Sequence, residues 1–571
     1  MTRSTLALLI SSTVMLSACG GGSSSDSTPP APTPTNSAPT DITLSSASVD
    51  ENAPAAVIGE LSAVDADSGD SFTFTTSNNA FVISGNSLSL AAAMVMDFEQ
   101  AETAEVEVSV TDAAGASFSK TLTISVNDLM DSYQFTSKYD DTSASSVSYG
   151  GQTTRHVLIA ELNAYIANDL ENDAEAGTLV SRDAVLAKLN SYFLVENYDL
   201  VADDFAVNLV ANSEQTNLRA LSSSDKNLIG KIAGNDASGQ HKDWNNGDFV
   251  GWGAAGSTTP QGLVEALFAE LADNTAEVIA GQVRQDAAGN PLPVYVSSNG
   301  RDLKQLLQKF LLMAVAYSQG ADDYLDFDTE GKGLLTDNTM NVDGKSYTNL
   351  EHQFDEGFGY FGAARDYLDY SDQEIAAKGG RDGWSQGYFD TSGNGSIDLF
   401  SEYNFGQAVN AAKRDLGATV PTHYTTQAMT AFIAGRQLIA NTQGALSDAQ
   451  MTELQGHALD ALDAWERSIA ATVVHYINDT SNDLNSYGTE AFSFTDLAKH
   501  WSELKGFGLG LQFNRHSPLS DADFAQFQQL VGDAPVFAND NDRAAYLADL
   551  QSARDLLQNA YGFNAENVAN W

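Results

Sequence analysis

The chain has 571 residues, 43% of them hydrophobic, and a formal net charge of −48 from 28 Lys and Arg against 76 Asp and Glu residues. This length suits roughly two to four domains, and the apolar fraction excludes a chain that is disordered throughout. The negative charge excludes nucleic acid as a partner, since a polyanion would be repelled, and it favours cations as ligands.

Residues 1–18 are typical of a lipoprotein signal peptide. Arg3 precedes an apolar run over residues 6–16, which is too short to span a bilayer as a permanent helix. The run ends in Leu-Ser-Ala-Cys, which resembles the lipobox of bacterial lipoproteins and contains the only cysteine of the chain, Cys19. The resemblance implies a lipid anchor on Cys19, and Gly20 after it implies the outer membrane, on its periplasmic or surface face.

Residues 19–38 predict a tether. The segment reads CGGGSSSDSTPPAPTPTNSA, in which Gly and Ser give flexibility and Pro gives extended spacing. Nothing in it can form a core, so we expect it to hold the folded part of the chain away from the membrane.

Residues 39–129 predict a small all-β sandwich of the immunoglobulin-like kind. Apolar residues alternate with polar ones in short runs, most clearly at Val106, Val108 and Val110 and again at Leu122 and Ile124. Gly, Asn, Asp and Ser separate the runs, and acidic residues gather at the expected strand ends.

The motifs VDENAP, AVDADSGD, DFE, VTDAAG and SVND of this segment resemble a cadherin repeat, a family that binds Ca²⁺ at the junctions between repeats. The resemblance implies two half-sites: at the C-terminal end Glu51, Asp97, Glu99, Asn127 and Asp128, and at the N-terminal end Asp65, Asp67 and Asp112. Carboxylates from several loops can supply the six to eight oxygens that Ca²⁺ prefers. The chain has one such repeat, and the alternative is a plain sandwich with acidic loop tips.

Residues 133–571 predict a large all-α, helical-bundle domain. Leu303, Leu306, Leu307, Phe310 and Leu311 mark one helical face, and strand-like alternation is scarce. The fold class is therefore a multidomain protein with a small β-sandwich and a large helical domain.

Four motifs of the helical region resemble an uncharacterised family of bacterial lipoproteins that is related to imelysin. They are SYGGQTTR, EHQFDEGFGYFG, DTSGNGSIDLFSEYNFGQAVNAAKRD and HWSELKGFGLGLQFN. The resemblance implies a helical, envelope-associated protein with a link to iron and a His-x-x-Glu motif.

Two helical segments pair an imidazole with carboxylates. His352 precedes Asp355 and Glu356, and His500 precedes Glu503. Residues three or four apart share a helix face, so two such helices facing inward could hold iron. The alternative is that both are packed histidines without a metal.

Residues 390–402 resemble an EF-hand loop and predict a calcium site. The oxygen-bearing positions are Asp390, Ser392, Asn394, the Ser396 carbonyl and Asp398, with Gly395 at the sharp turn. The closing acidic residue, Glu402, comes one position late, and the alternative is an Asx-rich turn.

Enzyme signatures are weak, and we expect a binding protein. Residues 383–387 fit G-x-S-x-G, but their surroundings are Gly-rich and helical, and the chain has no H-E-x-x-H zinc motif. We expect a calcium-binding, cell-envelope lipoprotein that binds or adheres to another cell-surface protein or to itself. The alternatives are an iron-acquisition protein using His352 and His500, and a metallopeptidase with Glu356 or Glu503 as base.

Overall fold

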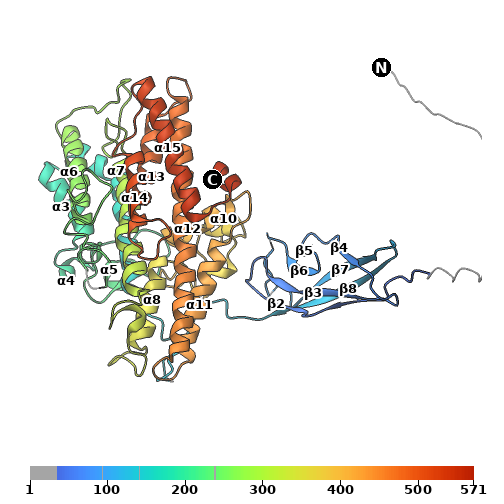
Figure 1. Ribbon diagram of the computed structural model, residues 1–571. Coiled ribbons are helices and arrows are strands. Elements are labelled where there is room, and N and C mark those ends of the chain that lie inside the picture. The colour runs from blue at the N-terminus through green and yellow to red at the C-terminus, as the bar shows by residue number, and fades with distance from the viewer. Residues whose placement is uncertain (1–34, 93, 99, 141, 144, 237–238) are drawn as a thin grey trace, which may run out of the picture.

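The computed structural model describes residues 35–571 except 93, 99, 141, 144 and 237–238. A β-sandwich is followed by a large helical domain (Figure 1), which confirms the expected fold class. The signal peptide, Cys19, most of the tether and Glu99 lie outside the described residues. Within the described ranges, no helix has the length and apolar character needed to cross a membrane.

The sandwich consists of two four-stranded sheets, with strand orders β1-β3-β6-β5 and β2-β8-β7-β4. Neighbouring strands are antiparallel except β2 and β8, which run parallel. The strands are β1 (Asp41–Leu44), β2 (Ser48–Asp50), β3 (Val57–Val64), β4 (Phe72–Thr76), β5 (Phe81–Ser84), β6 (Ser87–Leu90), β7 (Thr103–Asp112) and β8 (Ser117–Asn127).

The core of the sandwich lies between the two sheets. Val106, Val108 and Val110 of β7 are fully buried, and Leu88 of β6 faces them from the other sheet. Because side chains alternate across a strand, the polar residues between these valines point to solvent. Most acidic residues of the sandwich lie at its two ends, where the strands turn, and Glu60, Glu105 and Glu107 lie within strands.

The helical domain is built around α12, a helix of 39 residues. It packs against α10, α11, α13 and α15, and Figure 1 shows it running the length of the domain. The α-helices are α1 (Gly150–Asn168), α2 (Leu170–Glu175), α3 (Arg182–Phe193), α4 (Tyr198–Val201), α5 (Leu218–Leu221), α6 (Pro260–Ile279), α7 (Leu303–Leu311), α8 (Asn349–Phe361), α9 (Asp372–Ile375), α10 (Gly406–Leu416), α11 (Tyr424–Asn441), α12 (Asp448–Ser486), α13 (Phe494–Gly508), α14 (Asp521–Val531), α15 (Asp540–Tyr561) and α16 (Ala565–Asn570). Short 3₁₀ turns are η1 (Ile229–Lys231), η4 (Gly333–Leu335), η5 (Tyr367–Asp369) and η6 (Leu509–Gln512).

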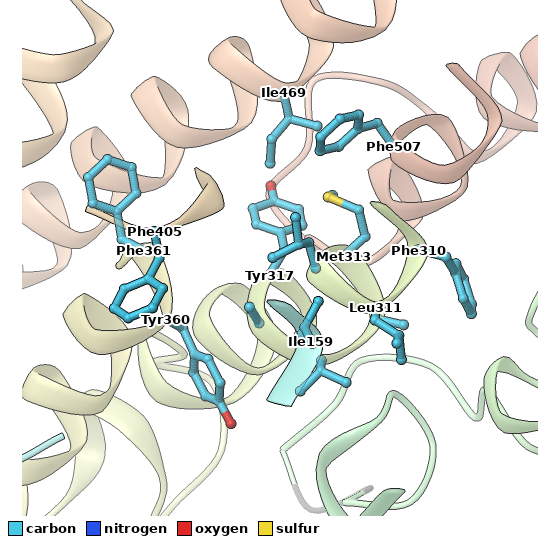
Figure 2. Packing of buried hydrophobic residues seen from close by; sticks show 14 of the residues in the cluster. Ile159, Phe310, Leu311, Met313, Tyr317, Tyr360, Phe361, Phe405, Ile469 and Phe507 are labelled. Atoms are coloured by element: carbon cyan, nitrogen blue, oxygen red, sulfur yellow. The ribbon is translucent and has the colours of Figure 1, made fainter. Parts of the chain in front are cut away.

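Helix α7 continues through two π-helical segments, η2 (Leu312–Tyr317) and η3 (Gly320–Tyr324), and residues 310–326 are buried without a break. Figure 2 shows Met313 and Tyr317 among side chains from several other helices, including Ile159 and Ile469. Gly320 allows one close approach, because a Cβ there would lie 2.8 Å from the ring of Trp465. The helix formed by α7, η2 and η3 is thus the buried centre of the domain, with other helices around it.

His156 of α1 is buried in this core and remains neutral there. Its Nε2 lies 3.1 Å from the carbonyl oxygen of Tyr360, and its ring stacks on Phe405. Burial lowers the pKa of His156 from 6.5 to about 4. Below pH 6.5 the unfolded chain therefore takes up a proton that the folded chain does not.

Acid should weaken the wild-type helical domain more than a His156→Phe variant. The His156 contribution to stability is present above pH 6.5 and is lost as the pH falls towards 4. At about 1.36 kcal/mol per pH unit, the wild type should lose about 2 kcal/mol more than the variant between pH 7 and pH 5. Urea unfolding followed by tryptophan fluorescence measures this, and equal losses in the two proteins would contradict it.

Candidate metal sites

Three aspartates come together in the loop between β3 and β4. Asp65, Asp67 and Asp70 each offer an oxygen, and these oxygens all lie within 4.8 Å of one another. In the parts of the chain that the structure covers, no other three His, Cys, Asp or Glu side chains do so. The Oδ2 atoms of Asp65 and Asp70 are buried and have no hydrogen-bond partner.

The segment before β1 closes over this cluster. The amide of Ser37 donates to Asp67 Oδ2 at 2.6 Å, and the side-chain amide of Asn36 donates to Asp112 Oδ2 at 2.8 Å. Asp112 ends β7 and is 5% exposed, and the hydrogen bond from Asn36 lowers its pKa. Burial raises the pKa of Asp70, and so do the neighbouring charges of Asp65, Asp112 and Asp67.

The N-terminal end of the sandwich fits a hard divalent cation. The candidate ligand atoms are all oxygens, of the kind that Ca²⁺ prefers, and two of them have no hydrogen-bond partner. Of the residues expected in this half-site from the sequence, Asp65 and Asp67 lie in the cluster, whereas Asp112 lies outside it and accepts from the amides of Ala114 and Ala116. Asp70 and the neighbouring Asn36 were not expected. Asp70 could have been found in the sequence, because it ends the same AVDADSGD motif.

At the opposite end of the sandwich, the carboxylates are already engaged. Glu51 is 1% exposed and accepts from the backbone amides of Phe98 at 2.8 Å and Leu129 at 2.6 Å. Asp97 accepts from the backbone and side chain of Gln100 at 2.9 and 2.6 Å. Of the other expected ligands of this half-site, Asn127 donates to Asp50 and Asp128 is exposed. Glu99 lies outside the described residues.

This second end faces the helical domain. A pocket of about 510 Å³ is lined by Glu51 and Leu129 of the sandwich side and by Gln427, His457 and Asp460 of helices α11 and α12. His423, just before α11, contacts the carbonyl oxygen of Ala92 at 2.7 Å. The helical domain thus packs against the end of the sandwich that carries Glu51.

Helix α8 directs two of its acidic residues, Glu351 and Asp355, inward. A capping box between Thr348 and Glu351 fixes its first turn. Asp355 is fully buried, lies 2.8 Å from Arg436 Nε and accepts from the hydroxyl of Tyr133 at 2.9 Å. Asp355 therefore belongs to an internal ion pair.

His352 and Glu356 lie on the more open side of α8. Nδ1 of His352 lies 2.9 Å from the carbonyl oxygen of Ser148, and Nε2 lies 3.8 Å from Glu356 Oε1. Glu356 accepts from the side-chain amide of Gln152, in the SYGGQTTR motif on α1, at 2.8 Å. This hydrogen bond therefore links two of the long sequence motifs, SYGGQTTR and EHQFDEGFGYFG.

The second histidine motif has different partners. Nδ1 of His500 on α13 lies 2.7 Å from Asp483 of α12, and Glu503 lies 3.4 Å from Lys309 of α7. Burial lowers the pKa of His500, but the hydrogen bond to Asp483 and the negative charges of Asp483 and Asp479 together outweigh burial, so the pKa is raised. Within the described chain, the two histidine motifs do not gather into one cluster of possible ligands.

The loop at residues 390–402 is closed by its own hydrogen bonds. The Asp390 carboxylate accepts from the amides of Asn394 at 3.0 Å and Gly395 at 2.7 Å, which lowers its pKa. Glu402, 2% exposed, accepts from the amides of Ser392 and Asp398. The remaining expected oxygens follow the same pattern: Asn394 accepts from Ser396, and Asp398 accepts from Ser401.

The fold defines a two-domain protein in which a β-sandwich with a candidate cation site precedes a large helical domain. Residues 131–531 match the family described as a domain of unknown function (DUF4856), and the chain belongs to this family. Among solved structures, the protocadherin GammaB4 extracellular domain is similar at 25% identity and a TM-score of 0.14. That match covers 20% of this chain and 18% of the other. No curated protein matches the chain significantly.

Proposed function

We propose that this protein is a Ca²⁺-binding protein of the cell envelope that acts in metal-dependent binding or adhesion. The observation that carries the proposal is the cluster of Asp65, Asp67 and Asp70, with two buried oxygens that lack a partner. The cadherin-like motifs support Ca²⁺ as the ion. The lipobox at Cys19 supports a lipid anchor in the outer membrane, and the resemblance to imelysin-related lipoproteins supports the same location.

Calcium would act by fixing the segment before β1 against the sandwich. Asn36 and Ser37 already contact Asp112 and Asp67, so an ion at the aspartates would hold the end of the tether against the domain. It would also remove the repulsion between neighbouring carboxylates. The helical domain would then be presented at a defined distance from the membrane, where it meets a second surface protein or another copy of this chain.

An Asp67→Asn variant should bind Ca²⁺ at this site at least tenfold more weakly than the wild type, because one anionic ligand becomes neutral. Calorimetric titration of the purified protein with CaCl₂ measures the affinity, which for extracellular modules is of order 10⁻⁴ to 10⁻³ M. Glu105→Gln is the matched control, since it removes one exposed carboxylate from β7 of the same sandwich. Equal affinities in the two variants, or no binding by the wild type, would overturn the proposal.

A further inference from the structure

A second acidic pocket lies where the chain enters the helical domain. It has a volume of about 460 Å³ and is lined by the carboxylates of Asp131, Asp366, Asp369 and Glu402. The hydroxyl of Thr391 lies in the same wall.

The walls of this pocket come from three segments far apart in the sequence: the linker after β8, the turn after α8, and the loop that ends at Glu402. Two backbone hydrogen bonds hold them in place. The Tyr133 amide donates to the Arg365 carbonyl at 2.7 Å, and the Arg365 amide donates to the Ser401 carbonyl at 2.8 Å. The fold therefore positions these acidic residues together.

Asp366 is the unusual member of this pocket. Its side chain is 8% exposed, and neither carboxylate oxygen has a hydrogen-bond partner. Among the described residues, no Lys, Arg or His forms an ion pair with it. Burial raises its pKa to about 7, and Asp369 and Glu402 add to this effect. A buried carboxylate without a partner is costly, so its presence points to a ligand.

The other groups around Asp366 leave its charge without a cationic partner. Arg365 lines the pocket, but its Nε donates to the hydroxyl of Tyr149 at 3.1 Å, and its guanidinium lies over the Tyr149 ring. Its charge is therefore directed away from Asp366. The hydroxyl of Thr391 donates to Glu402 Oε1 at 3.2 Å and also lies close enough to Asp366 to lower the pKa of that carboxyl, so a neutral oxygen lies near both acidic residues.

We propose that this pocket binds one divalent cation, with Asp366 and Glu402 as its charged ligands. Its carboxylate and hydroxyl oxygens suit Ca²⁺, and Arg365, the one cationic residue of the lining, is engaged with Tyr149. The acidic side chains do not form a group of three within 4.8 Å, so the ion would keep water among its ligands, for which the pocket has room. Asp131 belongs to the linker, so the ion would fasten the linker to the helical domain. This site is independent of the aspartate cluster in the sandwich.

The test uses the full protein carrying Asp67→Asn, so that Ca²⁺ binding at the sandwich site is weakened at least tenfold. Calcium should bind this protein with one clear event, and the added Asp366→Asn change should abolish that event or weaken it at least tenfold. Asp382→Asn is the matched control, because it removes an exposed carboxylate from the neighbouring loop. Equal Ca²⁺ binding with and without Asp366→Asn would overturn the proposal.

Thermal unfolding gives a second readout that a purely structural role of Asp366 would not produce. All six tryptophans follow residue 133, so their fluorescence reports the helical domain alone. Without Ca²⁺, the Asp366→Asn variant should have the higher Tm, because it lacks the buried charge. Added Ca²⁺ should raise the Tm of the protein that retains Asp366 and leave that of the variant unchanged. An equal Ca²⁺-induced rise in both would contradict the proposal.

Discussion

An Arg436→Met variant should lose about 3–5 kcal/mol of the free energy of unfolding of the helical domain. Arg436 on α11 is fully buried and lies 2.8 Å from Asp355 Oδ1 and 3.1 Å from Glu351 Oε1. Methionine would leave two buried carboxylates without their main counter-charge. Lys138, 3.9 Å from Glu351, would compensate only weakly. Urea unfolding followed by tryptophan fluorescence measures the loss.

The control for this prediction is Arg182→Met. Arg182 pairs with Asp273 on the surface, with side chains 41% and 63% exposed, so its loss should cost less than about 1 kcal/mol. Adding Asp355→Asn to the Arg436→Met variant should recover part of the stability, because it removes one unpaired charge. A loss of the same size in both arginine variants would contradict a role for burial.

A Glu466→Ala variant should also lose about 3–5 kcal/mol, because it leaves several buried donors without an acceptor and opens a cavity. Glu466 on α12 is 1% exposed. Its carboxylate accepts from the hydroxyls of Tyr317 at 2.8 Å, Tyr561 at 2.7 Å and Ser517 at 2.5 Å, and from the side-chain amide of Asn514. It joins the central π-helical segment to the C-terminal helices.

Asp463→Ala is the matched control for Glu466→Ala on the same helix. Asp463 is 53% exposed and pairs with Arg467, so its removal should change the free energy of unfolding by less than about 1 kcal/mol. The loss in the free energy of unfolding for Glu466→Gln should lie between those of the two Ala variants. The glutamine amide keeps one acceptor oxygen but turns a donor towards the hydroxyls. If the Ala variants at both positions unfold at the same urea concentration, the hydrogen bonds to Glu466 do not stabilise the helical domain, which would contradict the prediction.

The sequence predicted both folds because each has a local signature. Alternation at Val106, Val108 and Val110 requires only that one face of a strand is buried, and these residues are fully buried. Leu303 and Leu307 lie on one helical face, and both are in the core. Such patterns depend on neighbours within a few positions, so they can be recognised in a single sequence.

The partners of the candidate site residues could not be predicted in the same way. Asp355 and His352 are three positions apart, yet Asp355 pairs with Arg436, which is 81 residues further on, and His352 contacts Ser148. Asp366 is one of 76 acidic residues, and only the folded chain shows that it is buried without a partner. Tertiary contacts decide these roles, and periodicity carries no information about them.

The parallel pairing of β2 with β8 determines how the sandwich bears a mechanical load. Ser48, Val49 and Asp50 lie beside Ser125, Val126 and Asn127, and β8 leads directly into the helical domain. A pull between the chain before β1 and the helical domain acts on opposite ends of these two neighbouring strands. The hydrogen bonds between them are then loaded together in shear, rather than opened one after another as in a hairpin pulled from its free ends. The pairing of β2 with β8 thus resists tension along the chain in shear.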